Sequence, residues 1–149
     1  MIAAQADVIV SAKTEYACIA LLELAVRHGS GEPIRIRDIA EQHDIPSRFL
    51  VQILLQLKTA GLVNSVRGAA GGYQLAKEPD EITLGDVMTV VDNQWGKVAA
   101  NTPPTTPTSR VLYSIWHQVA AKEQEVLSGV TFADMAGRLQ PDEKGMYYI

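Results

Sequence analysis

Side chains suited to specific hydrogen bonding gather in the middle third of this 149-residue sequence. Arg48 and Gln52 lie four residues apart, and Arg67 stands directly before a glycine-rich stretch. A guanidinium and a carboxamide each present paired hydrogen-bonding groups that match the base edges of guanine and adenine, and a guanidinium also matches phosphate. This is the chemistry of recognition, so the elements that hold these residues decide what they could recognise.

The sequence lacks the patterns that bond-breaking chemistry needs. It has no glycine-rich phosphate-binding loop and no serine or cysteine nucleophile beside a base motif. Asp92, His117 and Glu123 form no recognisable catalytic set. We therefore expect a protein that is not an enzyme.

Arg48 and Gln52 belong to a predicted helix that runs from Pro46 to about Ala60. Proline suits a first helical turn, and Gly61 supplies a left-handed stop after the other end. We expect one face of this helix to be buried, because at 100° per residue it gathers Phe49, Leu50, Ile53, Leu54 and Leu57. The opposite face carries Arg48, Val51, Gln52, Leu55 and Thr59.

A hairpin follows this helix. The β-like runs Leu62–Arg67 and Tyr73–Ala76 are joined by Gly68–Gly72. Two helices precede it, over Ser11–His28, which is apolar on most sides, and over Ile36–His43. Helix, helix, turn, helix and hairpin in this order predict a winged helix-turn-helix, a mainly α fold with a small β-hairpin wing.

The second half of the chain predicts a long helix. Thr83 and Asp86 are typical of the start of a helix over Leu84–Asp92, and a Pro- and Thr-rich loop follows. From about Ser109 to Ser128 apolar residues recur along a rod roughly 30 Å long: Leu112, Val119 and Val126, with Ile115 and Trp116 beside them. A partner copy could bury this stripe, and so could the first helix of the same chain. A short helix over Thr131–Leu139 and a tail over Gln140–Ile149 complete the chain.

Composition and charge narrow the class of protein. With 47% hydrophobic residues the chain can bury a core, and its longest stretch without Asp, Glu, Lys or Arg, residues 98–109, is too short to span a membrane. Met1–Val10 lacks the positive charge of a signal peptide. The net charge is −4, yet Arg35–Lys77 carries six Lys and Arg against three Asp and Glu. A basic module on an acidic body is compatible with nucleic-acid binding.

Cys18 is the single cysteine, so the chain can form no internal disulfide and no cysteine-ligated metal site. We expect a reducing, cytoplasmic location. A small buried hydrophobe is the favoured interpretation of Cys18, and a redox switch is the alternative.

Seven short motifs occur in an order and spacing that resemble one known family: Lys13–Ala17, Ile39–Ala40, Phe49–Leu50, Gly61–Val63, Val66–Gly68, Gly71–Tyr73 and Ile82–Asp86. The family is the bacterial Rrf2 family of transcription regulators. The resemblance implies a homodimer on a palindromic DNA operator, and we expect a repressor. It divides the chain into a winged helix-turn-helix domain (1–82, with recognition helix 46–60 and wing 62–76), a connecting helix (83–93), a flexible loop (94–109) and a dimerisation helix with its tail (110–149).

Many members of that family bind an iron–sulfur cluster through three cysteines that lie before the long helix. In this sequence that segment, Asn93–Arg110, contains none, and His28, His43 and His117 share no ligand-like spacing. We expect a member without the cluster, with no metal and no other cofactor.

The resemblance implies DNA contacts from both elements. On the recognition helix, Arg48 would donate to guanine or phosphate and Gln52 would pair with adenine. Val51 stands where members often carry glutamate, so it should ignore that base or prefer a thymine methyl group. Leu55 either packs against the wing or contacts DNA. The remaining candidates are Arg67 in the minor groove, Gly71 and Gly72 close to the backbone, and Lys13 and Ser47 on phosphates.

Two other functions stay open. The apolar Val51–Leu55 surface could dock a protein, and a redox or metal sensor could use ligands other than cysteine. Trp95, Tyr113 and Trp116 could line a pocket for an unknown effector, although filling a dimer core is the favoured interpretation. We expect no membrane partner.

Overall fold

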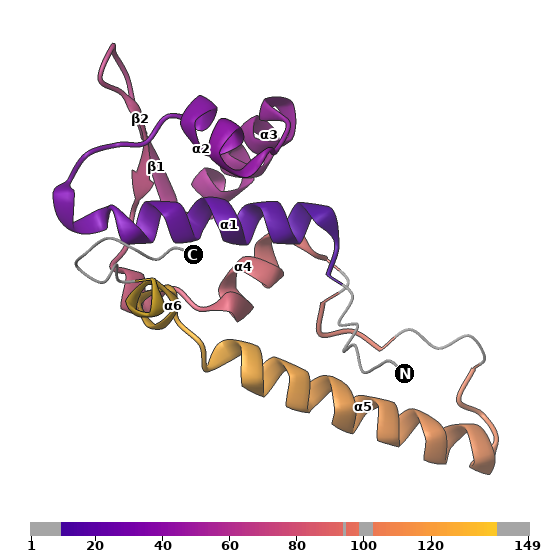
Figure 1. Ribbon diagram of the computed structural model, residues 1–149. Coiled ribbons are helices and arrows are strands. Elements are labelled where there is room, and N and C mark those ends of the chain that lie inside the picture. The colour runs from indigo at the N-terminus through magenta and orange to yellow at the C-terminus, as the bar shows by residue number, and fades with distance from the viewer. Residues whose placement is uncertain (1–9, 94, 99–102, 140–149) are drawn as a thin grey trace, which may run out of the picture.

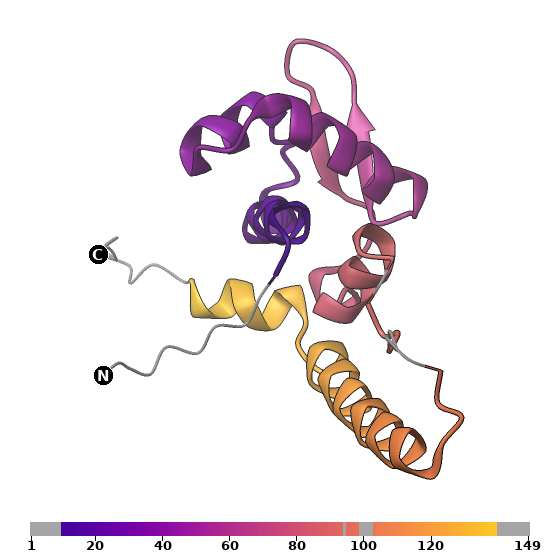
Figure 2. The same cartoon turned by 90° about the vertical axis from the view of Figure 1, so that its right-hand side faces the viewer.

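The computed structural model describes residues 10–93, 95–98 and 103–139. Helix α1 (Ala12–Val26) lies at the centre and separates two sets of elements (Figure 1). On one side are α2 (Ile36–His43), α3 (Ser47–Thr59) and the hairpin; on the other are α4 (Leu84–Val91) and α6 (Phe132–Arg138). Figure 2 looks along α1 and shows α3, α4 and α6 arranged around it. Within the described residues, no helix is both long and apolar enough to cross a membrane.

α1 forms as predicted but is shorter than expected. The Ser11 hydroxyl accepts a hydrogen bond from the Thr14 N–H at 3.2 Å and so caps the first turn. The helix ends at Val26 rather than at His28, because residues His28–Ser30 tighten into a 3₁₀ turn, η1. Gly31 ends that turn with a left-handed φ of 73°. The helix buries side chains on several sides, which fits its central position: Thr14, Ala17, Ala20, Leu21, Leu24 and Ala25.

The turn between α2 and α3 begins at Asp44, a left-handed residue with φ of 55°. α3 starts at Ser47, one residue later than predicted, since Pro46 serves as its N-cap with an extended backbone. Four of the five side chains expected inside are buried: Leu50, Ile53, Leu54 and Leu57. The prediction was wrong for Phe49, which is 41% exposed. Phe49 lies at the edge of the buried face and stacks on Tyr16 of α1 instead.

The wing consists of β1 (Val63–Val66) and β2 (Gly72–Leu75), paired antiparallel with Val63 opposite Leu75. The segment before α2 also pairs with β2. The N–H of Ile34 donates to the Tyr73 carbonyl and the N–H of Tyr73 donates to the Ile34 carbonyl, both at 2.8 Å. Tyr73 packs against the core and so anchors the wing.

The elements that follow the wing cover the side of the core that lies below α1 in Figure 1. A 3₁₀ turn, η2 (Pro79–Glu81), leads to α4, which has the predicted reciprocal cap between Thr83 and Asp86. α6 returns to the same place, because the N–H of Phe132 donates to the Ile82 carbonyl at 2.9 Å. The Phe132 ring is completely buried.

α5 (Pro107–Ser128) is a separate 22-residue rod that begins two residues before the predicted start. Its C-terminal end lies against α4, where Ser128 covers Gly85. None of its residues is buried, so the first helix of the same chain does not cover the apolar stripe. The predicted tail, 140–149, and residues 94 and 99–102 of the predicted loop lie outside the described residues.

Candidate nucleic-acid interface

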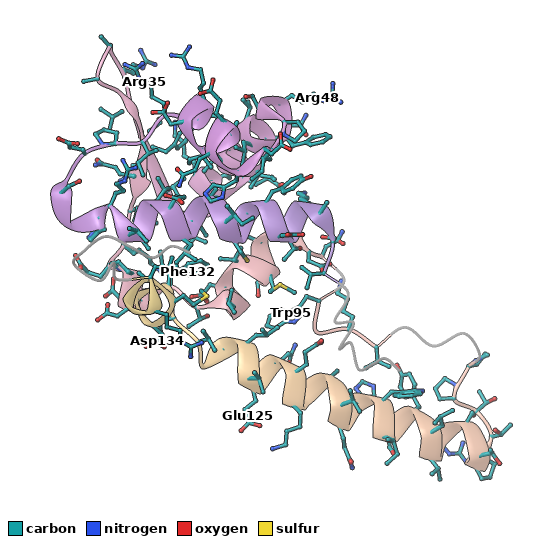
Figure 3. All side chains as sticks on the ribbon, viewed as in Figure 1. Arg35, Arg48, Trp95, Glu125, Phe132 and Asp134 are labelled. Atoms are coloured by element: carbon teal, nitrogen blue, oxygen red, sulfur yellow. The ribbon has the colours of Figure 1, made fainter. Side chains whose placement is uncertain are left out.

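The predicted recognition residues lie on the exposed face of α3. Arg48 and Gln52 are exposed there, with Val51 49% and Leu55 57% exposed beside them. Figure 3 shows Arg48 on α3 and Arg35 beside the hairpin, on the edge of the molecule opposite Glu125 and Asp134. The segment that forms α2, α3 and the wing, residues 35–77, carries a net charge of +3, so we call this edge the basic edge.

Arg48 is supported by a stack of two aromatic rings. Its guanidinium carbon lies 5.1 Å from the centre of the Phe49 ring, which is a cation–π distance. The Phe49 ring stacks in turn on Tyr16, with centroids 6.2 Å apart and planes within 18°. This stack explains why Phe49 is exposed: it connects an arginine of α3 to the side of α1.

Lys13 and Gln52 lie on the same part of the surface. Both line a cavity of about 320 Å³ between the first turns of α1 and α3, together with Ala12, Tyr16, Phe49 and Ile53. Ser47 is exposed in the first turn of α3. The packing of α1 on α3 thus joins the separate sequence candidates Lys13 and Gln52 into one surface.

The wing presents Arg67 directly after β1, where the side chain is exposed. The Nζ of Lys58 donates to the hydroxyl of Ser65 at 2.9 Å and so ties α3 to β1. The guanidinium of Arg35 donates to the carbonyl of Ala69 at the wing tip. The wing is therefore linked to α3 and to the N-cap of α2 by side chains as well as by the chain itself.

The two wing glycines are required by the protein's own backbone. A Cβ on Gly71 would lie 2.1 Å from the Val66 carbonyl oxygen, inside the hairpin. Gly72 has a φ of 149°, and a Cβ there would lie 2.5 Å from the carbonyl oxygen of Ile34. Tight packing alone accounts for both glycines, and their contact with a DNA backbone stays a prediction.

Leu55 is not buried against the wing. It lines an open groove of about 470 Å³ with Val90 of α4, and with Gln56, Thr59 and Ala60. The exposure of Leu55 does not fit packing against the wing, and its contact with DNA stays a prediction.

Comparison with known proteins identifies the family to which this chain belongs. The model of the family described as "Rrf2: Iron-dependent Transcriptional regulator" matches residues 10–138. The regulator CymR of Bacillus subtilis is 35% identical over 141 residues, covering 94% of this chain and 99% of CymR. The chain belongs to the Rrf2 family. It is thus a DNA-binding transcription regulator with a winged helix and not an enzyme.

Solved structures of Rrf2 relatives share the fold. The structure of CymR from B. subtilis superposes with a TM-score of 0.77 at 32% identity, covering 89% of this chain and 98% of that one. A structure of T. potens IscR superposes with a TM-score of 0.75 at 34% identity, covering 95% of this chain and 94% of IscR.

The residues of this Rrf2 chain do not fit an iron–sulfur cluster. Such a cluster needs several thiolates, and the sequence has one cysteine. Cys18 lies in α1, where burial raises the pKa of its thiol to about 11, so it is protonated rather than ligating. In the described parts of the chain no three His, Cys, Asp or Glu side chains converge on one point.

Two histidines instead join elements of the fold. The His43 imidazole lies 2.7 Å from a carboxylate oxygen of Glu23, linking α2 to α1. The His28 imidazole lies 3.3 Å from the carboxylate of Glu78, which follows the wing.

Sequence analysis missed Arg35 and the stacking role of Phe49. Arg35 reaches a carbonyl 34 residues along the chain, and no local pattern marks such a pairing. Helical periodicity predicts that Phe49 lies in the core, because periodicity carries no information about how far the neighbouring helix extends. The only sequence signal for the stack was an arginine next to an aromatic residue at the edge of the predicted buried face of α3.

Proposed function

We propose that this chain acts as a homodimeric repressor that binds a palindromic operator, with α3 in the major groove and the wing over the minor groove. The observation that carries the proposal is the shared exposure of Arg48 and Gln52 on α3 and of Arg67 directly after β1. An α-helix fits the major groove, and a neighbouring arginine suits a narrow minor groove.

The homodimer is supported by the uncovered stripe of α5. Leu112, Ile115, Trp116, Val119 and Val126 are between 44% and 64% exposed. A helix of 22 residues, about 33 Å long, would present an apolar stripe of the kind that marks protein interfaces, interrupted by Glu123 between Val119 and Val126. A two-fold dimer would then offer two copies of α3 to the two halves of a palindrome.

The proposed contacts divide into two kinds. Arg48, Gln52 and Arg67 would read bases, whereas Lys13, Ser47 and the backbone at Gly71 and Gly72 would position the protein on phosphates. Val51 and Leu55 offer only apolar contact, as to a thymine methyl group. Repression would follow from occupying an operator that overlaps a promoter, under the control of a small-molecule or protein effector.

The test is selection of bound fragments from random DNA, followed by titration of the selected site at two salt concentrations. We expect Arg48→Ala and Arg67→Ala each to weaken specific binding by about 1–3 kcal/mol. Arg138→Ala removes the same charge from α6 and should leave the affinity nearly unchanged. A steep decrease in affinity with salt is expected, because phosphate contacts release counterions.

Two outcomes would count against the proposal. If the wild-type protein binds the selected site no more tightly than scrambled DNA, the chain does not recognise an operator. The exposed Val51 and Leu55 would then favour a protein-interaction module. If binding is specific but unchanged in both arginine variants, the proposed docking of α3 and the wing is wrong.

A further inference from the structure

The wing is a small element with a flexible sequence at its tip. Two strands of four residues each form it, and an isolated two-stranded hairpin is marginal in water. Its tip is a turn in which the N–H of Gly71 donates to the Gly68 carbonyl at 2.9 Å. Gly68 has a φ of 105°, which glycine adopts easily, so the turn itself imposes little rigidity.

The segment before α2 holds β2 at the loop end of the hairpin. Ile34 exchanges both main-chain hydrogen bonds with Tyr73, and its carbonyl packs against Gly72. Ile34 is itself buried, with 5% exposure. This junction fixes the start of β2 to the helix-turn-helix, and the loop of residues 67–71 extends beyond it.

Arg35 extends this attachment to the tip. Its backbone is extended at the N-cap of α2, and its guanidinium donates to the carbonyl of Ala69. Ala69 is two residues after Arg67, so the contact restrains the loop that immediately follows the proposed minor-groove arginine. Figure 3 shows Arg35 beside the hairpin.

We propose that Arg35 is a positioning residue for the wing, which holds the tip so that Arg67 enters the minor groove in one orientation. The inference rests on the proposed function. Without the restraint, the tip samples several conformations, and ordering it on DNA lowers the affinity. The Ala69 carbonyl is exposed and can bond to water, so the effect of Arg35 on overall stability is small whereas its effect on DNA binding is larger.

A double-mutant cycle separates positioning from simple charge. If Arg35 acts through Arg67, Arg35→Ala should weaken binding to the selected operator about three- to tenfold in the wild-type background. In an Arg67→Ala background the same change should have almost no effect. An independent phosphate contact would instead give losses that add, with the salt slope reduced by about one in either background.

Arg37 supplies the matched control. It lies on α2, is exposed and carries the same charge. If Arg37→Ala weakens DNA binding, the loss of affinity should be the same in the wild-type and the Arg67→Ala backgrounds. Arg35→Lys keeps a donor that can reach Ala69, so we expect it to restore most of the binding and the coupling to Arg67.

Amide hydrogen exchange gives a second readout, taken on the free protein. Exchange at Ala69, Ala70 and Gly71 should accelerate in Arg35→Ala and remain at the wild-type rate in Arg37→Ala. If exchange is unchanged, if the losses add, or if Arg35→Ala binds as tightly as wild type, the positioning role is wrong. Failure of wild-type protein to prefer the operator over scrambled DNA would instead refute the proposed function.

Discussion

Cys18 shows how one residue's surroundings decide its chemistry. It packs against the core from α1, and burial raises the pKa of its thiol to about 11. Desolvation disfavours the thiolate, which is the nucleophilic and metal-binding form. At neutral pH the thiol is therefore protonated, which agrees with the interpretation of Cys18 as a small hydrophobic residue.

The raised pKa of Cys18 predicts a dependence of stability on alkaline pH. Between about pH 9 and pH 11 the unfolded thiol loses its proton while the folded thiol keeps it, so the free energy of unfolding decreases as pH rises. Relative to Cys18→Ala, the wild-type protein should lose up to about 2 kcal/mol over this window. Urea unfolding of both proteins at a series of pH values measures the difference. Parallel curves, or rapid alkylation of the native thiol at neutral pH, would contradict the prediction.

Among the elements, α6 depends most on its neighbours. It has seven residues, too few for a helix that is stable alone. A reciprocal cap between Thr131 and Asp134 begins it, and the Thr131 N–H bonded to the Asp134 carboxylate lowers the pKa of that group. Its attachment comes from Phe132, whose ring is fully buried and whose N–H donates to Ile82. α6 thus closes the core beneath α1.

Removing the ring of Phe132 should weaken the packing of α6 against the core. We expect Phe132→Ala to lower the free energy of unfolding by about 3–5 kcal/mol, because it leaves a cavity beneath α1. Phe132→Leu keeps most of the volume and should cost much less. Chemical denaturation followed by circular dichroism measures both. A loss below about 1 kcal/mol in the alanine variant would mean that α6 contributes little to the core.

At the scale of the whole molecule, opposite surfaces differ in charge and polarity. The segment Arg35–Lys77 carries a net +3, and the remainder carries −7. α5 extends away from α3 and the wing (Figure 1). Its apolar stripe is exposed. Under the proposed function, one surface would bind DNA and the other would bind a second copy of the chain.

The apolar stripe predicts a dimer that one charge can disrupt. Wild-type protein should have a mass of twice 16.2 kDa in solution. Val119→Glu places a carboxylate at the centre of the stripe and should shift the protein to the monomer, because burying an unpaired charge is costly. Ser114→Glu adds the same charge on the opposite face of α5 and should leave the dimer intact. Light scattering coupled to size-exclusion chromatography distinguishes these outcomes, and a monomeric wild-type protein would refute the dimer.

The sequence by itself determined the elements and their order. The Asp44–Pro46 turn, Gly61 and the glycines of the hairpin set boundaries through local backbone preferences, and Thr83 with Asp86 marked a helix start. These signals are local, since each depends on residues within a few positions. The single cysteine likewise settled the absence of a three-cysteine motif.

Only the tertiary structure decided how distant residues meet. The exposed stack of Phe49 on Tyr16, the approach of Gly72 to Ile34 and the bond from Arg35 to Ala69 each join segments separated by more than thirty residues. Such contacts depend on the angles and distances at which helices pack around α1, and these follow from the whole core rather than from any local pattern.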